Sequence, residues 1–195
     1  RDRSVSRGLG DVYKRQTEKN ATPAVTELIL RLSQRFPRHF FFTTSYLTTQ
    51  QVTDKQLPPN AGVIVSAINF PLRRIDGKDA KEKAFAGQLE QWKNVTKNIY
   101  IWDYINNFDD YLTPMPILKI ARQRLQFFKQ HGASGIFFNG SGYSYSSFDE
   151  MRTFVLSALL INPELSVDNL TASFFNQEYP AAKKWLYDYY TDLEN

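Results

Sequence analysis

The chain of 195 residues is 42% hydrophobic, 15% aromatic and 23% charged, a composition typical of one globular domain. It contains no cysteine, which excludes disulfides and thiolate metal sites, and no apolar run of about 18 residues that could span a membrane. Of the net charge of +4, residues 1–16 carry five basic and two acidic side chains, or +3, so the remainder is close to neutral and a basic nucleic-acid-binding face is not supported.

Residues 1–16 differ from the rest of the chain. They show no period and lack the apolar centre of a signal peptide. The hexapeptide at 11–16, DVYKRQ, corresponds to an in-frame translation of the end of a common transposon sequencing adaptor. We interpret 1–16 as an adaptor-derived segment, the alternative being a disordered natural arm, and leave it out of the fold prediction. On the first interpretation the native protein begins upstream, and 17–195 is the carboxy-terminal portion of its domain.

The remaining chain alternates between helical and strand patterns. In chain order we predict a helix at 25–36, strands at 39–46 and 62–68, a helix at 80–95, a strand at 99–104, a helix at 117–130, a strand at 135–138, and helices at 148–161, 168–178 and 181–192. The strands are short continuous apolar runs, which is typical of a parallel sheet covered by helices. The segment 47–61 has no helical pattern, so this crossover is predicted to be a long loop or a short irregular turn. No glycine-rich phosphate loop follows a strand, which disfavours the nucleotide-binding folds.

Polar and aromatic side chains follow each predicted strand. In parallel α/β folds, ligands bind at the carboxyl ends of the strands. The candidate substrate-binding residues at these positions are Tyr46, Asn69, Trp102, Tyr104, Asn107, Asn139 and Tyr143. Aromatic rings stack on the C–H faces of a pyranose and amides hydrogen-bond to hydroxyls, so this set predicts a carbohydrate ligand. Structural alternatives exist, with Trp102 as barrel core and the asparagines as turn formers.

Asp103 is the one carboxylate that stands clearly at a predicted strand end, and we assign it as the candidate catalytic residue. The structural alternative is that it caps a turn or pairs with an arginine. Glycoside hydrolysis usually requires two carboxylates, about 5–5.5 Å apart for retention or roughly 6.5–9.5 Å apart for inversion. The sequence does not supply a partner for Asp103, which fits either a barrel whose other half provides it or a non-catalytic domain. Two histidines, His39 and His131, are too few for a histidine-rich metal centre, and we expect no metal or cofactor.

The segment from Trp92 to Gly140 carries a family resemblance. Its pieces are WDY at 102–104, NF at 107–108, YL at 111–112, prolines at 114 and 116, FF at 127–128, and glycines at 132 and 135. In this pattern the chain resembles the domain of unknown function 4838, and the later segment 148–189 fits as well. The resemblance implies the carboxy-terminal half of a (β/α)8 TIM-like barrel with closing helices, related to glycoside hydrolases and found in secreted or periplasmic bacterial proteins.

The same resemblance frames the functional expectations. It implies that the chain is a fragment of a carbohydrate-active, glycoside-hydrolase-like protein of unknown specificity. The alternative is a non-catalytic carbohydrate-binding or interdomain support module. The expected partners are a carbohydrate and the missing amino-terminal half of the same barrel, with neither nucleic acid nor a membrane span.

Overall fold

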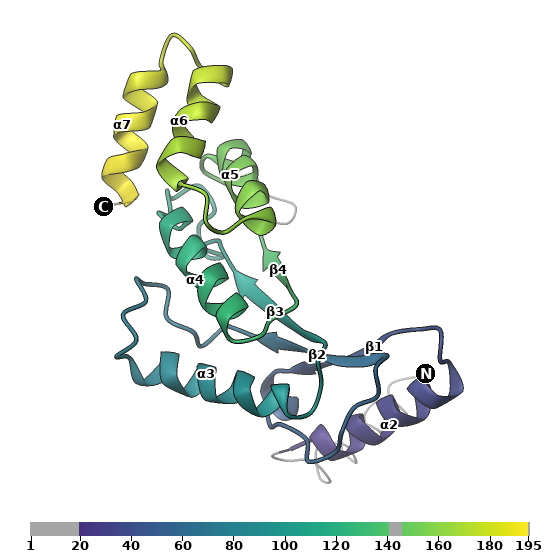
Figure 1. Ribbon diagram of the computed structural model, residues 1–195. Coiled ribbons are helices and arrows are strands. Elements are labelled where there is room, and N and C mark those ends of the chain that lie inside the picture. The colour runs from purple at the N-terminus through teal and green to yellow at the C-terminus, as the bar shows by residue number, and fades with distance from the viewer. Residues whose placement is uncertain (1–19, 141–145, 195) are drawn as a thin grey trace, which may run out of the picture.

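The computed structural model describes residues 20–140 and 146–194 and shows an α/β chain (Figure 1). In chain order the elements are α2 (Thr22–Arg35), β1 (Phe41–Ser45), the 3-10 helix η1 (Leu47–Thr49), β2 (Ala61–Ser66), α3 (Ala80–Lys93), β3 (Ile99–Tyr104), α4 (Leu118–Gln130), β4 (Gly135–Asn139), α5 (Asp149–Ile161), α6 (Val167–Glu178) and α7 (Lys183–Glu194). Every predicted helix and strand is confirmed, with ends that shift by a few residues. The predicted segment 1–16 and the candidate Tyr143 lie outside the described residues. Among the helices that the structure describes, none has the length and apolar character needed to cross a membrane.

The four strands form one sheet in the order β1-β2-β3-β4, and all three pairings are parallel. The crossover between β1 and β2 contains only the short helix η1, as the absence of a helical pattern at 47–61 predicted. The later strands alternate with helices, and α6 and α7 close the chain as a pair of adjacent helices at one end of the molecule (Figure 1). This is the architecture of a partial TIM-like barrel with closing helices.

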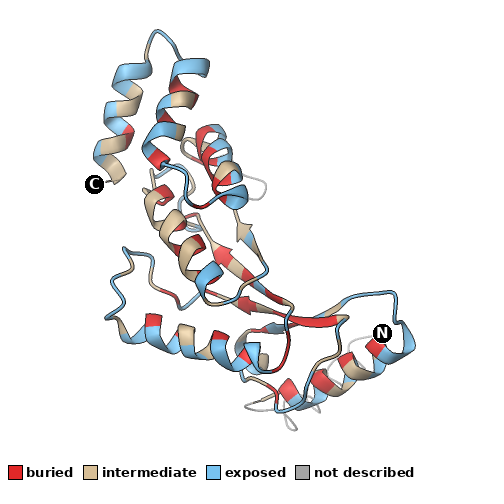
Figure 2. Ribbon diagram, in the orientation of Figure 1, coloured by how far each residue is buried: buried red, intermediate tan, exposed pale blue. Residues whose placement is uncertain are grey.

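One face of the sheet is covered by helices. Val63, Val65, Ile99 and Ile101 are fully or almost fully buried and share a hydrophobic core with Leu89, Trp92 and other side chains of α3, as well as Phe128 of α4. Helix α3 begins where it does because the Asp79 side chain accepts hydrogen bonds from the backbone N–H groups of Lys81 and Glu82. In Figure 2 buried residues run along the strands, and on the helices they alternate with exposed ones.

A second core joins the closing helices to α4. Leu118, Val155, Leu159 and Phe175 are among its buried members. The carboxylate of Glu194, at the end of α7, accepts hydrogen bonds from the backbone N–H groups of Leu118 at 2.8 Å and Lys119 at 3.0 Å, and so caps the start of α4. The last helix of the chain is therefore tied to the helix that precedes β4.

The opposite face of the sheet carries no helix among the described elements. Phe42, Tyr100 and Phe137 point to this side and remain 37%, 39% and 59% exposed. The rings of Phe42 and Tyr100 lie edge to face, with centroids 5.2 Å apart. Each ring lies over a glycine of the neighbouring strand, because a Cβ at Gly62 would meet the Phe42 ring at 2.6 Å and one at Gly135 would meet the Tyr100 ring at 2.7 Å. We call this surface the open face.

Candidate functional site

Three of the predicted substrate-binding residues come together at the carboxyl end of the open face. The ring centroids of Tyr46 and Trp102 lie 5.7 Å apart. Trp102 and Tyr104 project from the same side of β3 and stack with centroids 5.6 Å apart and an interplanar angle of 26°. Because the register of the sheet pairs Tyr104 with Asn139, the predicted amide of β4 stands beside this group. The fold therefore brings four of the predicted residues together, the three aromatic ones and Asn139.

The aromatic group continues into the loop after β3. Phe108 lies edge to face with Tyr104 at 6.1 Å, and Tyr111 lies edge to face with Phe108 at 5.9 Å. Tyr46, Trp102, Tyr104, Phe108 and Tyr111 together form what we call the aromatic row. The indole Nε1 of Trp102 is buried and has no hydrogen-bond acceptor among the described residues. The row thus offers ring faces and contains one buried N–H donor that has no acceptor among the described residues.

Asp103 faces the other way. Its side chain lies on the helix-covered face, fully buried, between the outward-pointing Trp102 and Tyr104 of the same strand. Arg124 of α4 pairs with both carboxylate oxygens, its Nε donating to Oδ2 at 2.7 Å and its terminal NH2 group donating to Oδ1. The backbone N–H of Tyr104 adds a third hydrogen bond, to Oδ1, at 2.8 Å. These contacts leave the carboxylate no path to a ligand in the aromatic row, and they match the structural alternative of a paired arginine. The catalytic role of Asp103 stays a prediction.

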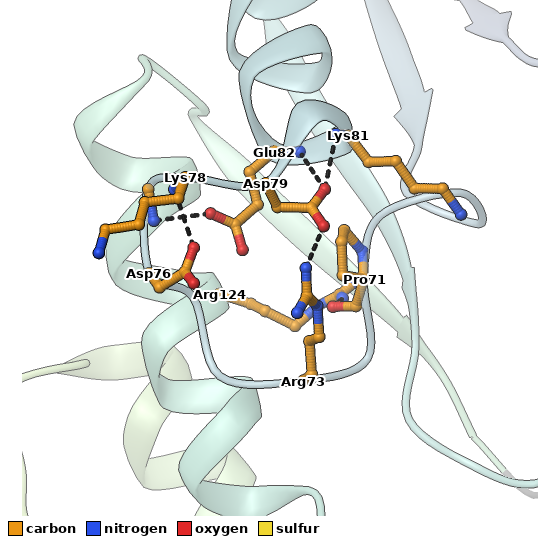
Figure 3. Close-up of polar contacts among 9 residues, drawn as sticks. Pro71, Arg73, Asp76, Lys78, Asp79, Lys81, Glu82 and Arg124 are labelled. Atoms are coloured by element: carbon orange, nitrogen blue, oxygen red, sulfur yellow. Dashed lines mark hydrogen bonds and ion pairs between the residues drawn. The ribbon is translucent and has the colours of Figure 1, made fainter.

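Arg124 connects Asp103 to the loop that follows β2. The third guanidinium nitrogen, Nη1, donates to the backbone oxygens of Pro71 at 2.7 Å and Phe70 at 3.3 Å. The guanidinium also lies over the Phe70 ring, 4.7 Å from its centroid. Figure 3 shows Arg124 reaching toward Pro71 beneath the start of α3. The buried ion pair therefore holds the ends of β2 and β3 in a fixed relation.

The loop after β2 is fixed further by its own polar contacts (Figure 3). Arg73 forms an ion pair with Asp79, and the backbone N–H of Gly77 donates to Glu82 at 2.8 Å. Gly77 has φ +71°, which a residue without a Cβ adopts at little cost. Hydrogen bonding from the backbone N–H of Lys81 holds the pKa of Asp79 below its ordinary value. Within the described ranges, no group of three His, Cys, Asp or Glu residues could hold a metal ion.

The remaining predicted residues stand apart from the aromatic row. Asn69 lies in the turn after β2 and is exposed, and within the described part of the chain its side chain has no hydrogen bond to the row. The Asn107 side chain accepts a hydrogen bond from the backbone N–H of Asp109 at 3.1 Å, which is the turn-forming role that asparagine often has. Both remain candidate binding residues, and neither is brought to the row by the fold.

Sequence analysis missed a second polar group near the ends of β3 and β4. The guanidinium of Arg152, on α5, donates to the Asn106 side-chain oxygen at 2.5 Å, to the backbone oxygen of Ile105, and to Ser146 Oγ at 3.4 Å. Burial lowers the pKa of Arg152, an effect that the nearby Tyr190, Asp149 and Glu194 partly offset. Asn106 is one of the amides that follow β3 in the sequence, where its type also suits a turn, whereas Arg152 lies inside a helix and nothing in its sequence position marks it.

Comparison with known proteins places the chain at the level of a family. No curated protein and no solved structure matches it. A family model described as a domain of unknown function, DUF4838, matches residues 14–192 and so covers most of the chain. The chain belongs to the DUF4838 family, as the WDY motif and the prolines after it suggested.

Proposed function

We propose that this chain contributes the sugar-binding end of a carbohydrate-active, glycoside-hydrolase-like barrel protein. The observation that carries the proposal is the aromatic row, which lies at the carboxyl ends of parallel strands, where barrel proteins bind their ligands. Stacked rings bordered by an amide suit the alternating C–H and hydroxyl surfaces of a sugar. The buried Nε1 of Trp102 lacks an acceptor among the described residues, and a sugar hydroxyl that reached it would supply one.

The other strands of a barrel would complete this site. Parallel sheets are almost always covered on both faces, whereas here Phe42, Tyr100 and Phe137 stay partly exposed on the open face. Strands β1 and β4 are the two edges of the described sheet, and each can pair with a further parallel strand. We infer that the amino-terminal half of the barrel covers the open face and supplies any carboxylate that acts on the bound sugar.

A second candidate function, binding or interdomain support without catalysis, is favoured by a specific observation. The only carboxylate that the sequence places at a strand end, Asp103, is enclosed by Arg124 on the covered face. A domain with this arrangement could hold a polysaccharide without cleaving it. Hydrolysis of a glycan panel by this chain joined to the inferred other half of the barrel separates the two, because only an enzyme releases reducing ends. Equal rates for that protein and its Asp103→Asn variant would remove Asp103 from the chemistry.

The binding proposal is tested by affinity electrophoresis of the full chain in gels that contain xylan, mixed-linkage β-glucan or galactomannan. We expect retardation in at least one gel and its loss in the Trp102→Ala variant. Trp185→Ala is a matched control, because Trp185 is 72% exposed on α7 and belongs to neither the aromatic row nor the sheet. Equal retardation of wild type and Trp102→Ala, or migration of wild type at the same rate in all gels, would count against the proposal.

A further inference from the structure

A small cavity lies beside the ends of β3 and β4, against α5. Its volume is about 260 Å³, which is below the roughly 300–1,000 Å³ typical of sites for drug-sized ligands and suits a single sugar ring. Apolar side chains on its wall come from Ile105, Phe138, Leu156 and Leu160. Its polar wall is formed by Asn106, Asp149 and Arg152, together with two hydroxyl side chains of α5. Asn106 follows Tyr104 by two residues, so the cavity lies near the same end of the sheet as the aromatic row, but on the helix-covered face to which Phe138 points.

Two residues that line the cavity each carry a buried, unused hydrogen-bond donor. Arg152 is 4% exposed and Asn106 is 7% exposed. The Nε of Arg152 and the Nδ2 of Asn106 have no acceptor among the described residues, although the other polar atoms of both side chains are engaged. Buried donors in native proteins are nearly always paired with an acceptor. A ligand that accepts a hydrogen bond from both atoms would supply the two missing acceptors.

Asp149, the third of these polar side chains, is an acceptor, and its negative charge balances the positive charge of the Arg152 guanidinium. Asp149 stands one helical turn before Arg152, at the first position of α5, and its Oδ1 accepts from Ser146 Oγ at 2.7 Å. Its second oxygen, Oδ2, accepts no hydrogen bond from the described residues. One guanidinium and one carboxylate on the same wall sum to zero, so the cavity does not favour an anion. Two donors and one acceptor match adjacent hydroxyl groups, each of which both accepts and donates.

We propose that this cavity binds one neutral sugar ring through adjacent hydroxyl groups, with Arg152 and Asn106 donating and Asp149 accepting. The inference rests on the proposed carbohydrate function and deepens it, because it adds a subsite with a stated preference for neutral over acidic sugars. The apolar side chains on the wall contact the C–H face of the ring. Because Phe138 points to the helix-covered side, the cavity is a separate subsite from the aromatic row on the open face.

The test measures binding of methyl glucoside, methyl galactoside, methyl mannoside and glucuronate to the full chain by ligand-detected NMR. Ser157 is exposed on the wall of the cavity, so Ser157→Trp blocks the space without changing a core side chain. Asp149→Asn keeps an oxygen for Ser146 but leaves the guanidinium without its balancing charge. Glu150→Gln is the matched control, because it removes one carboxylate from the same first turn of α5 at an exposed position that does not line the cavity.

We expect at least one neutral glycoside to bind and Ser157→Trp to weaken it by about tenfold or more, equivalent to at least about 1.4 kcal/mol. Asp149→Asn should shift the preference toward glucuronate by about tenfold, because charge-assisted hydrogen bonds are roughly twice as strong as neutral ones. Glu150→Gln should do neither. Tighter binding of glucuronate than of the glycosides by wild type would overturn the proposal, as would unchanged binding by Ser157→Trp. Polysaccharide retention that depends on Trp102 would still support the proposed function in that case, so the two failures are distinguishable.

Discussion

Strand β3 presents two different surfaces to its surroundings. Ile99, Ile101 and Asp103 point to the helices and are 0–1% exposed, whereas Tyr100, Trp102 and Tyr104 point to the open face. The first set is held by hydrophobic contacts and one ion pair, and the second is held mainly by contacts between aromatic rings. Residues that alternate along one strand therefore have separate roles, one set positioning the strand ends and the other remaining available to a ligand.

The three residues of the WDY motif do not share one face of the sheet. Trp102 and Tyr104 belong to the aromatic row, while Asp103 between them reaches Arg124 and, through it, the backbone of the loop after β2. A motif that looks like one binding site in sequence is divided between the two faces of the sheet. Its aspartate is placed to fix the geometry in which its aromatic neighbours are presented.

The largest expected effect comes from breaking the buried ion pair on the covered face. Asp103→Asn leaves the Arg124 guanidinium buried without a counter-charge, which typically costs about 3–5 kcal/mol of unfolding free energy. Urea unfolding followed by circular dichroism measures the loss. The double variant Asp103→Leu with Arg124→Met, which removes both charges, should recover most of the stability. A double variant as unstable as Asp103→Asn would show that the pair contributes specific contacts rather than charge neutralisation.

A matched pair of tryptophans sharpens the contrast between the faces. Trp92, on α3, is fully buried in the covered core, so Trp92→Ala should cost about 3–5 kcal/mol. Trp102→Ala should cost only about 1–2 kcal/mol, since its main described contacts are the rings of Tyr46 and Tyr104. The same unfolding measurement on both variants tests the difference. Equal losses would mean that the open face is as tightly packed as the covered one.

The sequence predicted the covered side better than the site. Short apolar runs and helical periods placed β1–β4 and α2–α7 within a few residues, because each pattern reports burial against one neighbour. The aromatic row was found for Tyr46, Trp102 and Tyr104, since strand ends in a parallel sheet meet at one edge. The partner of Asp103 could not be identified from the sequence. Arg124 lies 21 residues away on an amphipathic helix that carries three more basic residues, and no pattern distinguishes it from them. Arg152 was missed because its partner Asn106 lies 46 residues away in the chain, and no sequence spacing links the two.

In the closing helices, Tyr190 of α7 should make the stability of the fold depend on pH. Burial and the neighbouring Glu194 carboxylate raise the pKa of Tyr190 well above its ordinary value. A raised pKa in the folded state means that the stabilisation is complete below about pH 10, the pKa of an unfolded tyrosine, and is lost as the pH rises above it. We expect unfolding free energy to fall by up to about 1.4 kcal/mol per pH unit above pH 10 from this group. Tyr190→Phe should remove that part of the slope, and an unchanged slope would refute the assignment.

A substitution on the open face should have the smallest effect on unfolding free energy but a clear effect on self-association of the chain. Phe137 is 59% exposed on edge strand β4, and exposed apolar surface beside an unpaired strand promotes association between copies of a chain. Phe137→Lys should change unfolding free energy by no more than about 0.5 kcal/mol, because surface substitutions usually do no more than this. Sedimentation velocity should show the wild-type chain associating and the variant shifted toward monomer.

Leu112→Lys, which changes a 72% exposed side chain in the loop after β3, is the matched control and should leave association unchanged. A monomeric wild type with a sharp cooperative transition would show that the open face needs no cover, and the inferred amino-terminal half of the barrel would lose its main support.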